Sequence, residues 1–339
     1  MTASRKALVL TLASLTFAIL ALVLSSSALA QTDPPALGDG DWTVRDTTMI
    51  SDWGVIMLRG DLRVTDGGDL TLSNSTLLFV NSEAGEHGLV VDNGGSIHII
   101  EGSTVGSSRP NVAWTFVVED GCTLEIRDSS IEECGKPAFG LRPNWRELAL
   151  YVGTADAVVE DTSFLGGLTG LYFAEGVIAS PVRNCTFENA YGIVTWGTSV
   201  EDCTFHDQTL YGVVFHGGTE GRIVRSTFDG VFATCVQVGF EYFEPSYELF
   251  TAQVIIEDCT FVSSVRAIRV LTGSTASISD CDIDGMEREG IVAWEGAIVH
   301  LFDGNIMNST NAILCSDGAW MDWNVTGHSR VLRGNVTLA

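Results

Sequence analysis

Short alternating runs of apolar and polar residues recur along the chain, and each run ends in the same kind of turn. The turn reads Asp or Asn, a small residue, a hydroxyl residue and a large apolar residue, as in Asp202-Cys203-Thr204-Phe205. The large apolar residue of successive copies is Leu77, Ile131, Phe164, Phe187, Phe205, Phe228, Phe261, Ile283 and Ile306. From 164 onward the steps between copies are 23, 18, 23, 33, 22 and 23 residues, which indicates a solenoid with insertions in its loops.

A second type of strand follows each turn and begins with a small residue and an aliphatic one. Gly192-Ile193-Val194 and Gly290-Ile291-Val292 are examples. Short strands separated by Gly, Asp, Asn and Ser turns leave no window for helices. A coil of about 22 residues then holds three short strands and three turns, which is the geometry of an all-β, parallel β-helix.

Alternation along the strands assigns each position of the turn to a face of the coil. The large apolar residue points inward, the hydroxyl residue before it points outward, and the small residue before that points inward at the corner. The leading Asp or Asn suits a left-handed turn conformation, which these residues tolerate better than most. The resulting acidic column could also hold calcium ions, although turn chemistry explains it without a ligand.

The N-terminal residues have the three-part layout of a cleaved secretory signal. Arg5 and Lys6 precede an apolar run over residues 7–24, and Ala28-Leu29-Ala30 provides a small-residue cleavage site. We therefore expect a secreted or cell-surface protein with no membrane insertion after cleavage. The predicted layout is a signal peptide over 1–30, a lead-in over 31–50, the β-helix over 51–322, and a further module or truncated coil over 323–339.

Acidic residues dominate the composition. The chain has 43 Asp and Glu against 18 Lys and Arg, a formal net charge of −25, and removal of Arg5 and Lys6 makes the mature charge −27. Such a surface repels nucleic acids and anionic lipids and favours cations or neutral sugars. The last coil has no polar cap, which predicts either a longer parent protein or end-to-end self-association.

Eight cysteines would suggest four disulfides in a secreted chain. However, Cys185, Cys203, Cys259 and Cys281 occupy the inward corner position that Ser and Thr fill in other coils. Register places Cys185 over Cys203 and Cys259 over Cys281, with parallel Cβ vectors that fit a disulfide poorly. The sequence does not decide whether these two pairs are disulfides or free thiols. The spacing of the cysteines matches no metal-ligand motif, so no metal site is predicted.

The Asp/Asn-x-Thr-Phe turns and the Gly-Ile-x-x-Trp strands resemble those of the right-handed parallel β-helix proteins in the pectin-lyase-like superfamily, over about residues 50 to 320. The resemblance implies the fold more than an activity, because this scaffold carries lyases, hydrolases, epimerases, adhesins and surface-layer proteins. The polygalacturonase-like motifs are incomplete: Phe215-His216-Gly217 and Ile268-Arg269-Val270 are the nearest matches. The resemblance therefore favours a non-catalytic member.

Outward positions on the Gly-Ile strands form a candidate carbohydrate-binding strip. In the resembled family the corresponding sheet often lines the saccharide groove. The strip consists of Tyr172, Trp196, His216, Arg269 and Trp294. The alternative is that Trp196 and Trp294 pack beneath the turn loops.

A second outward column provides candidate catalytic residues. Glu188, His206 and Asp229 fall on consecutive coils, so the carboxylates should lie about 9.5 Å apart with an imidazole between them. That separation is at the upper limit for an inverting glycosidase. The alternative is a solvated acidic edge.

Residues 133–147 and 240–250 are predicted to form two inserted loops. They are further candidates for binding, because binding commonly resides in long loops on a rigid scaffold. The leading hypothesis is a structural or adhesive β-helix that binds carbohydrate along the aromatic strip. The alternative is a polysaccharide lyase or glycoside hydrolase.

Overall fold

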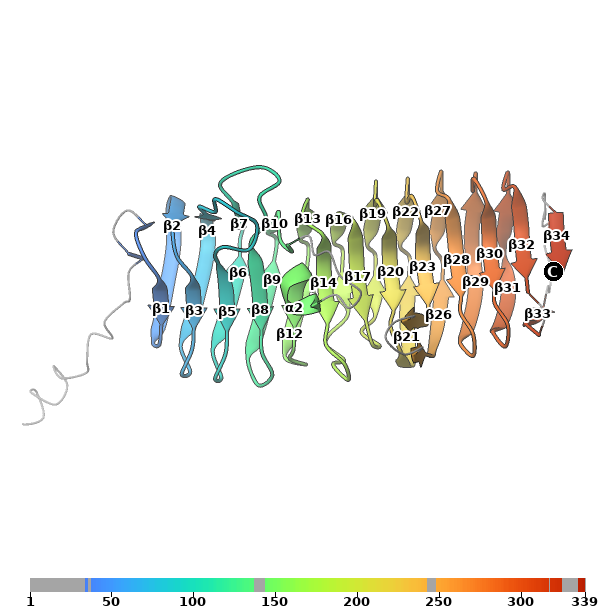
Figure 1. Cartoon of the computed structure of the whole chain (residues 1–339), viewed down its shortest axis with the longest axis horizontal. Helices are drawn as coiled ribbons and strands as arrows, with labels where there is room; N and C mark the ends of the chain where they lie inside the picture. Colours follow the sequence, from blue (N-terminus) through green and yellow to red (C-terminus); the bar gives the residue numbers. More distant parts are fainter. Residues whose placement is uncertain are drawn as a thin grey trace, which may run out of the picture.

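The computed structural model describes residues 34–35, 38–136, 144–242, 248–316, 318–324 and 335–338, and shows a rod of stacked coils (Figure 1). Coils follow one another along the rod axis in chain order, with a coil length of about 23 residues. Within the described residues, two parallel sheets of 13 and 19 strands run the length of the rod. The predicted fold class, an all-β parallel β-helix, is confirmed.

Sheet I contains the strands that are predicted to begin with a small residue and an aliphatic one, together with others that lack this pair. Its strands are β1 (Trp42–Val44), β3 (Leu62–Val64), β5 (Gly88–Val91), β8 (Thr115–Val118), β11 (Ala149–Val152), β14 (Thr169–Phe173), β17 (Tyr191–Thr195), β20 (Tyr211–Phe215), β23 (Thr234–Val238), β28 (Arg266–Val270), β30 (Glu289–Ala293), β32 (Asn311–Cys315) and β34 (Asn335–Leu338).

Sheet II contains the runs before and after each Asp/Asn turn. Its strands are β2 (Thr47–Leu58), β4 (Asp69–Phe79), β6 (Ser96–Ile100), β7 (Thr104–Ser107), β9 (Thr123–Arg127), β10 (Ser130–Glu132), β12 (Ala157–Glu160), β13 (Ser163–Leu165), β15 (Val182–Arg183), β16 (Thr186–Glu188), β18 (Val200–Glu201), β19 (Thr204–His206), β21 (Gly218–Val224), β22 (Thr227–Asp229), β26 (Ala252–Glu257), β27 (Thr260–Val262), β29 (Thr275–Asp284), β31 (Ile298–Met307) and β33 (Trp320–Asn324).

The middle coils have the three short strands that the sequence predicts, whereas coils near the ends do not. There, the two strands of sheet II merge through the turn into β2, β4, β29 and β31, which are 10 to 12 residues long. The sheets also extend beyond the predicted β-helix boundaries, because β1 begins at Trp42 and β33 and β34 continue sheets II and I. The predicted signal peptide lies outside the described residues.

The core contains a stack of five phenylalanines, one per coil. Phe164, Phe187, Phe205, Phe228 and Phe261 follow one another with ring centroids 4.7 to 5.0 Å apart and nearly parallel planes. Gly170, Gly192 and Gly212, near the starts of β14, β17 and β20, each lie against one of these rings. A Cβ on Gly192 would lie 2.6 Å from a Phe205 ring carbon and 2.5 Å from the Gly212 carbonyl oxygen. Glycine at this position therefore permits close packing of ring and backbone.

The corner turns have the left-handed conformation that the sequence predicts. Asp161, Asn184 and Asp202 have φ of 51°, 50° and 55°, and Arg225 takes the same conformation with φ of 49°. The next residue points inward and donates a hydrogen bond to the carbonyl two residues before it. Thr162 Oγ1 donates to the Glu160 carbonyl at 2.7 Å. The corner position thus favours a small side chain that is also a donor, and Gly304 is the exception among these turns.

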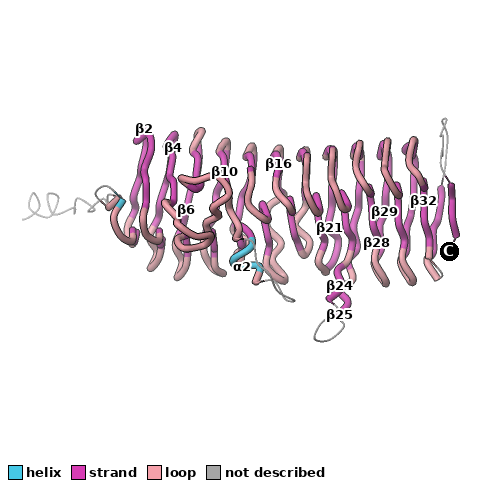
Figure 2. The backbone as a smooth tube through the Cα atoms, turned by 45° about the horizontal axis from the view of Figure 1, so that its top comes forward, coloured by secondary structure: helices cyan, strands magenta, loops and turns pink. Residues whose placement is uncertain are grey.

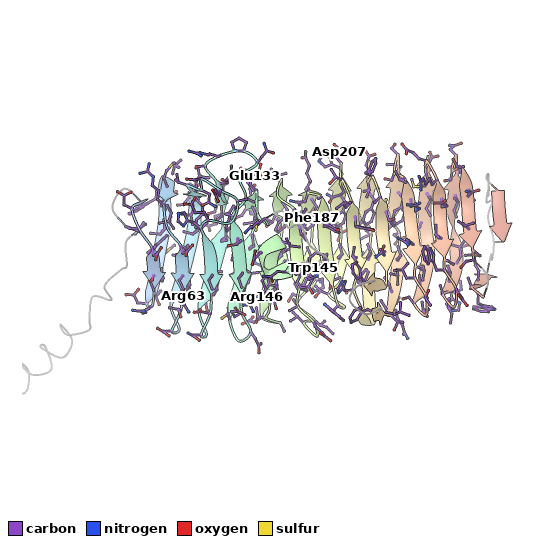
Figure 3. The ribbon with its side chains drawn as sticks, viewed as in Figure 1. Arg63, Glu133, Trp145, Arg146, Phe187 and Asp207 are labelled. Carbon is purple, nitrogen blue, oxygen red and sulfur yellow. The ribbon has the colours of Figure 1, made fainter. Side chains whose placement is uncertain are left out.

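The two inserted loops lie on the outer face of sheet I. The first contains the four-residue helix α2 (Trp145–Leu148), which contradicts the expectation of no helix, and whose Trp145 and Arg146 are labelled in Figure 3. The second forms an antiparallel hairpin from β24 (Phe240–Tyr242) and β25 (Glu248–Phe250), which projects from the rod in Figure 2. No helix within the described ranges is long and apolar enough to cross a bilayer.

Candidate functional site

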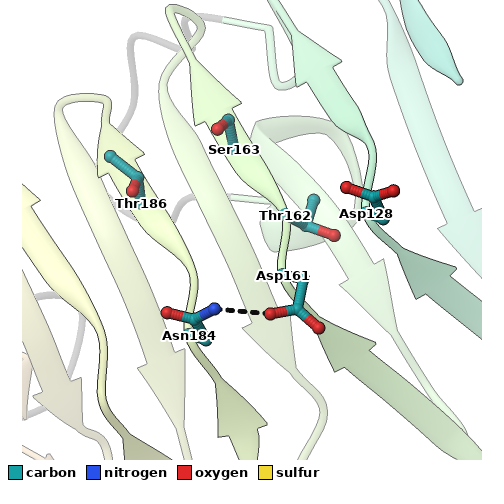
Figure 4. Close-up of a pocket in the computed structure, with 6 residues that line it drawn as sticks. All are labelled: Asp128, Asp161, Thr162, Ser163, Asn184 and Thr186. Carbon is teal, nitrogen blue, oxygen red and sulfur yellow. Dashed lines mark hydrogen bonds between the residues drawn. The ribbon is translucent and has the colours of Figure 1, made fainter. Parts of the chain in front are cut away.

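The corner column of Asp and Asn residues forms polar contacts from coil to coil. Asn184 Nδ2 donates to Asp161 Oδ1 (Figure 4), and Arg225 forms two hydrogen bonds of 2.7 Å with the carboxylate of Asp202. A hollow of 550 Å³ opens beside Asp128, Asp161 and Asn184, lined by hydroxyl groups and carboxylates (Figure 4). Neighbouring amide and guanidinium groups therefore compensate part of the acidic charge.

Calcium binding by this column gains no support from its geometry. Among the residues that the structure describes, no group of three or more His, Cys, Asp or Glu side chains is placed to hold a metal ion. The carboxylates of Asp161 and Asp202 accept hydrogen bonds from the next coil instead. The column is explained by turn conformation and coil-to-coil hydrogen bonding.

The candidate catalytic residues lie on the outer side of sheet II. Glu188 and His206 contact each other, with 3.5 Å between Oε2 and Nε2, and Asp207 contacts the other ring nitrogen of His206 at 3.2 Å. Asp229 is the register partner of His206, and its side chain is exposed. The imidazole is thus paired with Glu188 and Asp207, rather than with Glu188 and Asp229 as the sequence suggested. The Glu188 and His206 side chains are 50% and 38% exposed, so neither lies in a water-excluding site.

The candidate carbohydrate strip is divided by the two inserted loops. Tyr172 and His216 point away from the core as predicted, but they are only 7% and 2% exposed. Trp145 of α2 stacks on Tyr172 with centroids 4.9 Å apart, and Phe240 of the hairpin lies 4.1 Å from the His216 ring. The expectation that Tyr172 and His216 are accessible is therefore wrong, because the loops cover this part of sheet I.

His216 is the point where both inserted loops meet. The Trp145 ring approaches it edge-on at 6.0 Å, and the Phe250 ring stacks on it at 5.6 Å. Trp196, the next member of the strip, packs edge-on against His216 at 5.2 Å and against Phe250 at 5.4 Å. Burial lowers the pKa of His216 from 6.5 to about 4, so the ring is neutral at pH 7. These contacts give Tyr172, Trp196 and His216 a packing role.

The remaining two members of the strip lie together beyond the hairpin. The guanidinium carbon of Arg269 lies 4.5 Å from the centroid of the Trp294 ring, and Trp294 is 37% exposed. Beside them, the Arg266 guanidinium binds the Glu289 carboxylate at 2.7 Å. Cation–π contact of this kind attracts the guanidinium to the face of the ring. Arg269 and Trp294 therefore form the accessible part of the predicted strip.

Sequence reasoning missed a second exposed aromatic residue on sheet II. Trp320 is 53% exposed and approaches His300 edge-on, with centroids 5.4 Å apart. Phe302 lies on the same face, one outward position along β31 from His300. The signal was present in the alternation of Ile298, His300 and Phe302 along β31.

The sequence model for a right-handed β-helix region matches residues 61–228 and, in an overlapping alignment, residues 115–283. The chain belongs to the right-handed β-helix family. Family membership agrees with the two parallel sheets and the inward phenylalanine stack. No curated protein sequence matches the chain.

Three carbohydrate-active enzymes are among the solved structures that show a distant similarity to this chain. One is a mannuronic acid specific polysaccharide family 6 lyase from human gut microbiota, with 13% identity and a TM-score of 0.35 over 86% of this chain and 79% of the lyase. Another is the catalytic unit of a thermostable GH87 α-1,3-glucanase from Streptomyces thermodiastaticus, with 12% identity and a TM-score of 0.36 over 86% and 64%. A third is endopolygalacturonase I from Stereum purpureum, with 10% identity and a TM-score of 0.29 over 92% and 98%. Similarity at this level carries no conclusion about the activity of this chain.

Proposed function

We propose that this β-helix protein is a secreted or cell-surface module with a structural or adhesive role, which binds a neutral polysaccharide at Trp294. The observation that supports the proposal is the partly exposed indole of Trp294 on the outer face of sheet I, held by Arg269 at 4.5 Å. Tryptophan offers a large apolar surface with few rotatable bonds, so it gains contact area at a small entropic cost. A fixed and exposed indole suits the apolar face of a sugar ring.

Charge restricts the class of polysaccharide. The formal net charge of −25 disfavours approach of an anionic polymer, and the nearby Arg266 is already paired with Glu289. A neutral polymer avoids this repulsion. Binding of such a polymer should therefore depend weakly on salt, because no ion pair between protein and ligand has to form.

A glycan microarray tests this proposal with three proteins. We expect the wild-type chain to bind neutral polysaccharides and Trp294→Ala to lose at least tenfold in signal, because the only exposed ring of the strip is removed. Trp320→Ala is the matched control, since it deletes an exposed indole from sheet II, and it should bind as wild type does. Equal binding by Trp294→Ala and wild type would contradict the proposal.

Secretion is a separate part of the proposal and has its own test. It is supported by the basic residues, apolar run and Ala28-Leu29-Ala30 site at the start of the chain. Expression of the full chain should release a protein whose N-terminal sequence begins near Gln31. Retention of Met1 on the cell-associated protein would contradict cleavage.

The rival function is a polysaccharide lyase or glycoside hydrolase that uses Glu188, His206 and Asp229. The observation that favours it is the contact between Glu188 and His206, which brings a carboxylate beside an imidazole. Incubation with polyuronic acids and neutral glucans would then release unsaturated products or new reducing ends, and His206→Ala would abolish them. The absence of product from a broad panel would exclude this function.

A further inference from the structure

Three asparagines at turns of sheet II each begin the acceptor pattern for an N-linked glycan, which is Asn, any residue except Pro, then Ser or Thr. The patterns are Asn74-Ser75-Thr76, Asn184-Cys185-Thr186 and Asn308-Ser309-Thr310. Asn74 and Asn184 lie at the corner between the two runs of sheet II, and Asn308 directly follows β31. Such a short pattern also arises by chance, so the structural context has to support it.

The three asparagines share one backbone conformation and one kind of environment. Their φ angles are 44°, 50° and 51°, which is the left-handed turn conformation. All three asparagines are exposed, whereas the residue after each of them is buried. Each acceptor amide therefore lies at the outer rim of a tight turn, which is where a bulky and solvated group can be attached.

A hollow beside Asn184 gives a first sugar room on the surface. This hollow of 550 Å³ is lined by Asn184 itself, by the hydroxyl groups of Ser163 and Thr186, and by the carboxylate of Asp128 (Figure 4). Hydroxyl and carboxylate oxygens are suitable hydrogen-bond partners for the hydroxyl groups of a sugar. A sugar on Asn184 therefore finds both space and polar contacts without a change in the backbone.

Attachment of a glycan preserves the hydrogen bond that each asparagine makes to the preceding coil. The bonds run from Asn74 Nδ2 to Asp52 Oδ1 at 2.6 Å, from Asn308 Nδ2 to Asp284 Oδ1 at 2.6 Å, and from Asn184 Nδ2 to Asp161 Oδ1. A side-chain amide has two N–H groups, and a glycan replaces only one of them. The remaining N–H still donates to the aspartate, so the modified turn keeps its contact between coils.

We propose that Asn74, Asn184 and Asn308 are acceptor sites for N-linked glycans. In the transfer, Nδ2 forms a bond to C1 of the first sugar of a glycan carried on a polyprenyl phosphate or diphosphate, and the bond between C1 and the phosphate oxygen breaks. The lipid phosphate leaves with the electron pair, and the amide proton passes to solvent, so nothing is oxidised or reduced. The inference rests on export of the chain and is independent of polysaccharide binding at Trp294.

Mapping of modified sites on the exported chain tests the proposal. The mature chain is produced in yeast behind the signal of a yeast protein, so a failure of residues 1–30 to direct export does not affect the outcome. Peptide N-glycosidase in heavy-oxygen water converts each glycosylated asparagine to a labelled aspartate, which mass spectrometry locates. We expect label at all three asparagines.

Asn305 is the internal control in the same spectrum. Its Nδ2 also donates to an aspartate of the preceding coil, Asp282, at 2.7 Å, but Met307 stands where the pattern needs a hydroxyl residue. Asn305 should therefore carry no label. Label at Asn305 equal to that at the three sites would overturn the proposal, because the label would then not follow the acceptor pattern.

Thr186→Val and Thr186→Ser are a matched pair of variants. Val55 and Ser163 occupy the same column of sheet II as Thr186, so both variants should fold, and circular dichroism checks this. Thr186→Val should lose the label at Asn184 alone, whereas Thr186→Ser should keep it. A site without label in the wild-type chain is excluded as an acceptor. Absence of label at all three sites, or label at Asn184 that Thr186→Val leaves unchanged, would overturn the proposal.

Discussion

Phe205 lies in the middle of the five-phenylalanine stack, and its replacement tests how the coils are held together. Its side chain is fully buried, and its ring stacks between Phe187 at 4.9 Å and Phe228 at 4.7 Å. Phe205→Ala removes the ring and both stacking contacts. Phe205→Leu instead retains an aliphatic side chain of the kind that Ile131 and Ile283 provide at the same position in other coils.

Because the Phe205 ring is fully buried, the loss of stability in the alanine variant should fall in the range that is usual for a core phenylalanine. Phe→Ala in a well-packed core costs about 3–5 kcal/mol, since neighbouring groups refill only part of the cavity. Each lost aromatic contact accounts for about 0.5–1.5 kcal/mol beyond buried area. We therefore expect Phe205→Ala to lower the free energy of unfolding by about 4 kcal/mol and Phe205→Leu by about 1–2 kcal/mol.

Urea unfolding followed by circular dichroism measures these differences. Thr204→Ala is the control, because the Thr204 side chain is exposed on the adjacent position of β19 and its removal should change the free energy of unfolding by less than about 0.5 kcal/mol. The reasoning is refuted if Phe205→Ala is as stable as Thr204→Ala. It is also refuted if the leucine variant is as unstable as the alanine variant.

Three further outcomes follow from other contacts. A Cβ on Gly212 would lie 2.6 Å from the Cys235 carbonyl oxygen and 2.7 Å from a Phe228 ring carbon, so Gly212→Ala should lower the free energy of unfolding in urea by about 1–3 kcal/mol. Burial lowers the pKa of His216 from 6.5 to about 4, so protonation of this ring costs the folded protein about 3 kcal/mol more than it costs the unfolded chain. This share of the free energy of unfolding is fully present above pH 6.5 and is lost as the pH falls toward 4. His216→Leu should therefore show a smaller loss of stability between pH 7 and pH 4 in urea titrations, and an unchanged pH dependence would contradict this. Arg225 pairs with Asp202 on the surface and has a positive φ of 49°. Arg225→Asn should therefore change the free energy of unfolding by less than about 0.5 kcal/mol, and a larger loss would contradict the small contribution that surface ion pairs usually make.

The features that repeat from coil to coil could be predicted from the sequence. The inward Phe205, the outward Thr204 and the left-handed Asp202 all follow from local alternation and turn chemistry, and the structure confirms each of them. The donor role of the inward corner residue was missed. Its signal was present, because Ser, Thr or Cys fills this position in every copy of the turn except that of Gly304, and Ala is absent.

Features that depend on the inserted loops could not be predicted. Tyr172 and His216 have the outward direction that alternation assigns, but periodicity does not show what an insertion covers. Trp145 reaches Tyr172 from a loop that has no counterpart in other coils. Accessibility of the strip therefore depended on two long-range contacts that only the three-dimensional structure shows.

Binding of a neutral polysaccharide at Trp294 is tested most directly by affinity electrophoresis. Wild type, Trp294→Ala and Trp320→Ala are run in native gels that contain a neutral glucan or galactomannan at increasing concentration. The proposal predicts that the polymer retards wild type and Trp320→Ala equally, and that Trp294→Ala migrates as it does without polymer. Equal retardation of Trp294→Ala and wild type, or no retardation of wild type by any neutral polymer tested, would contradict it.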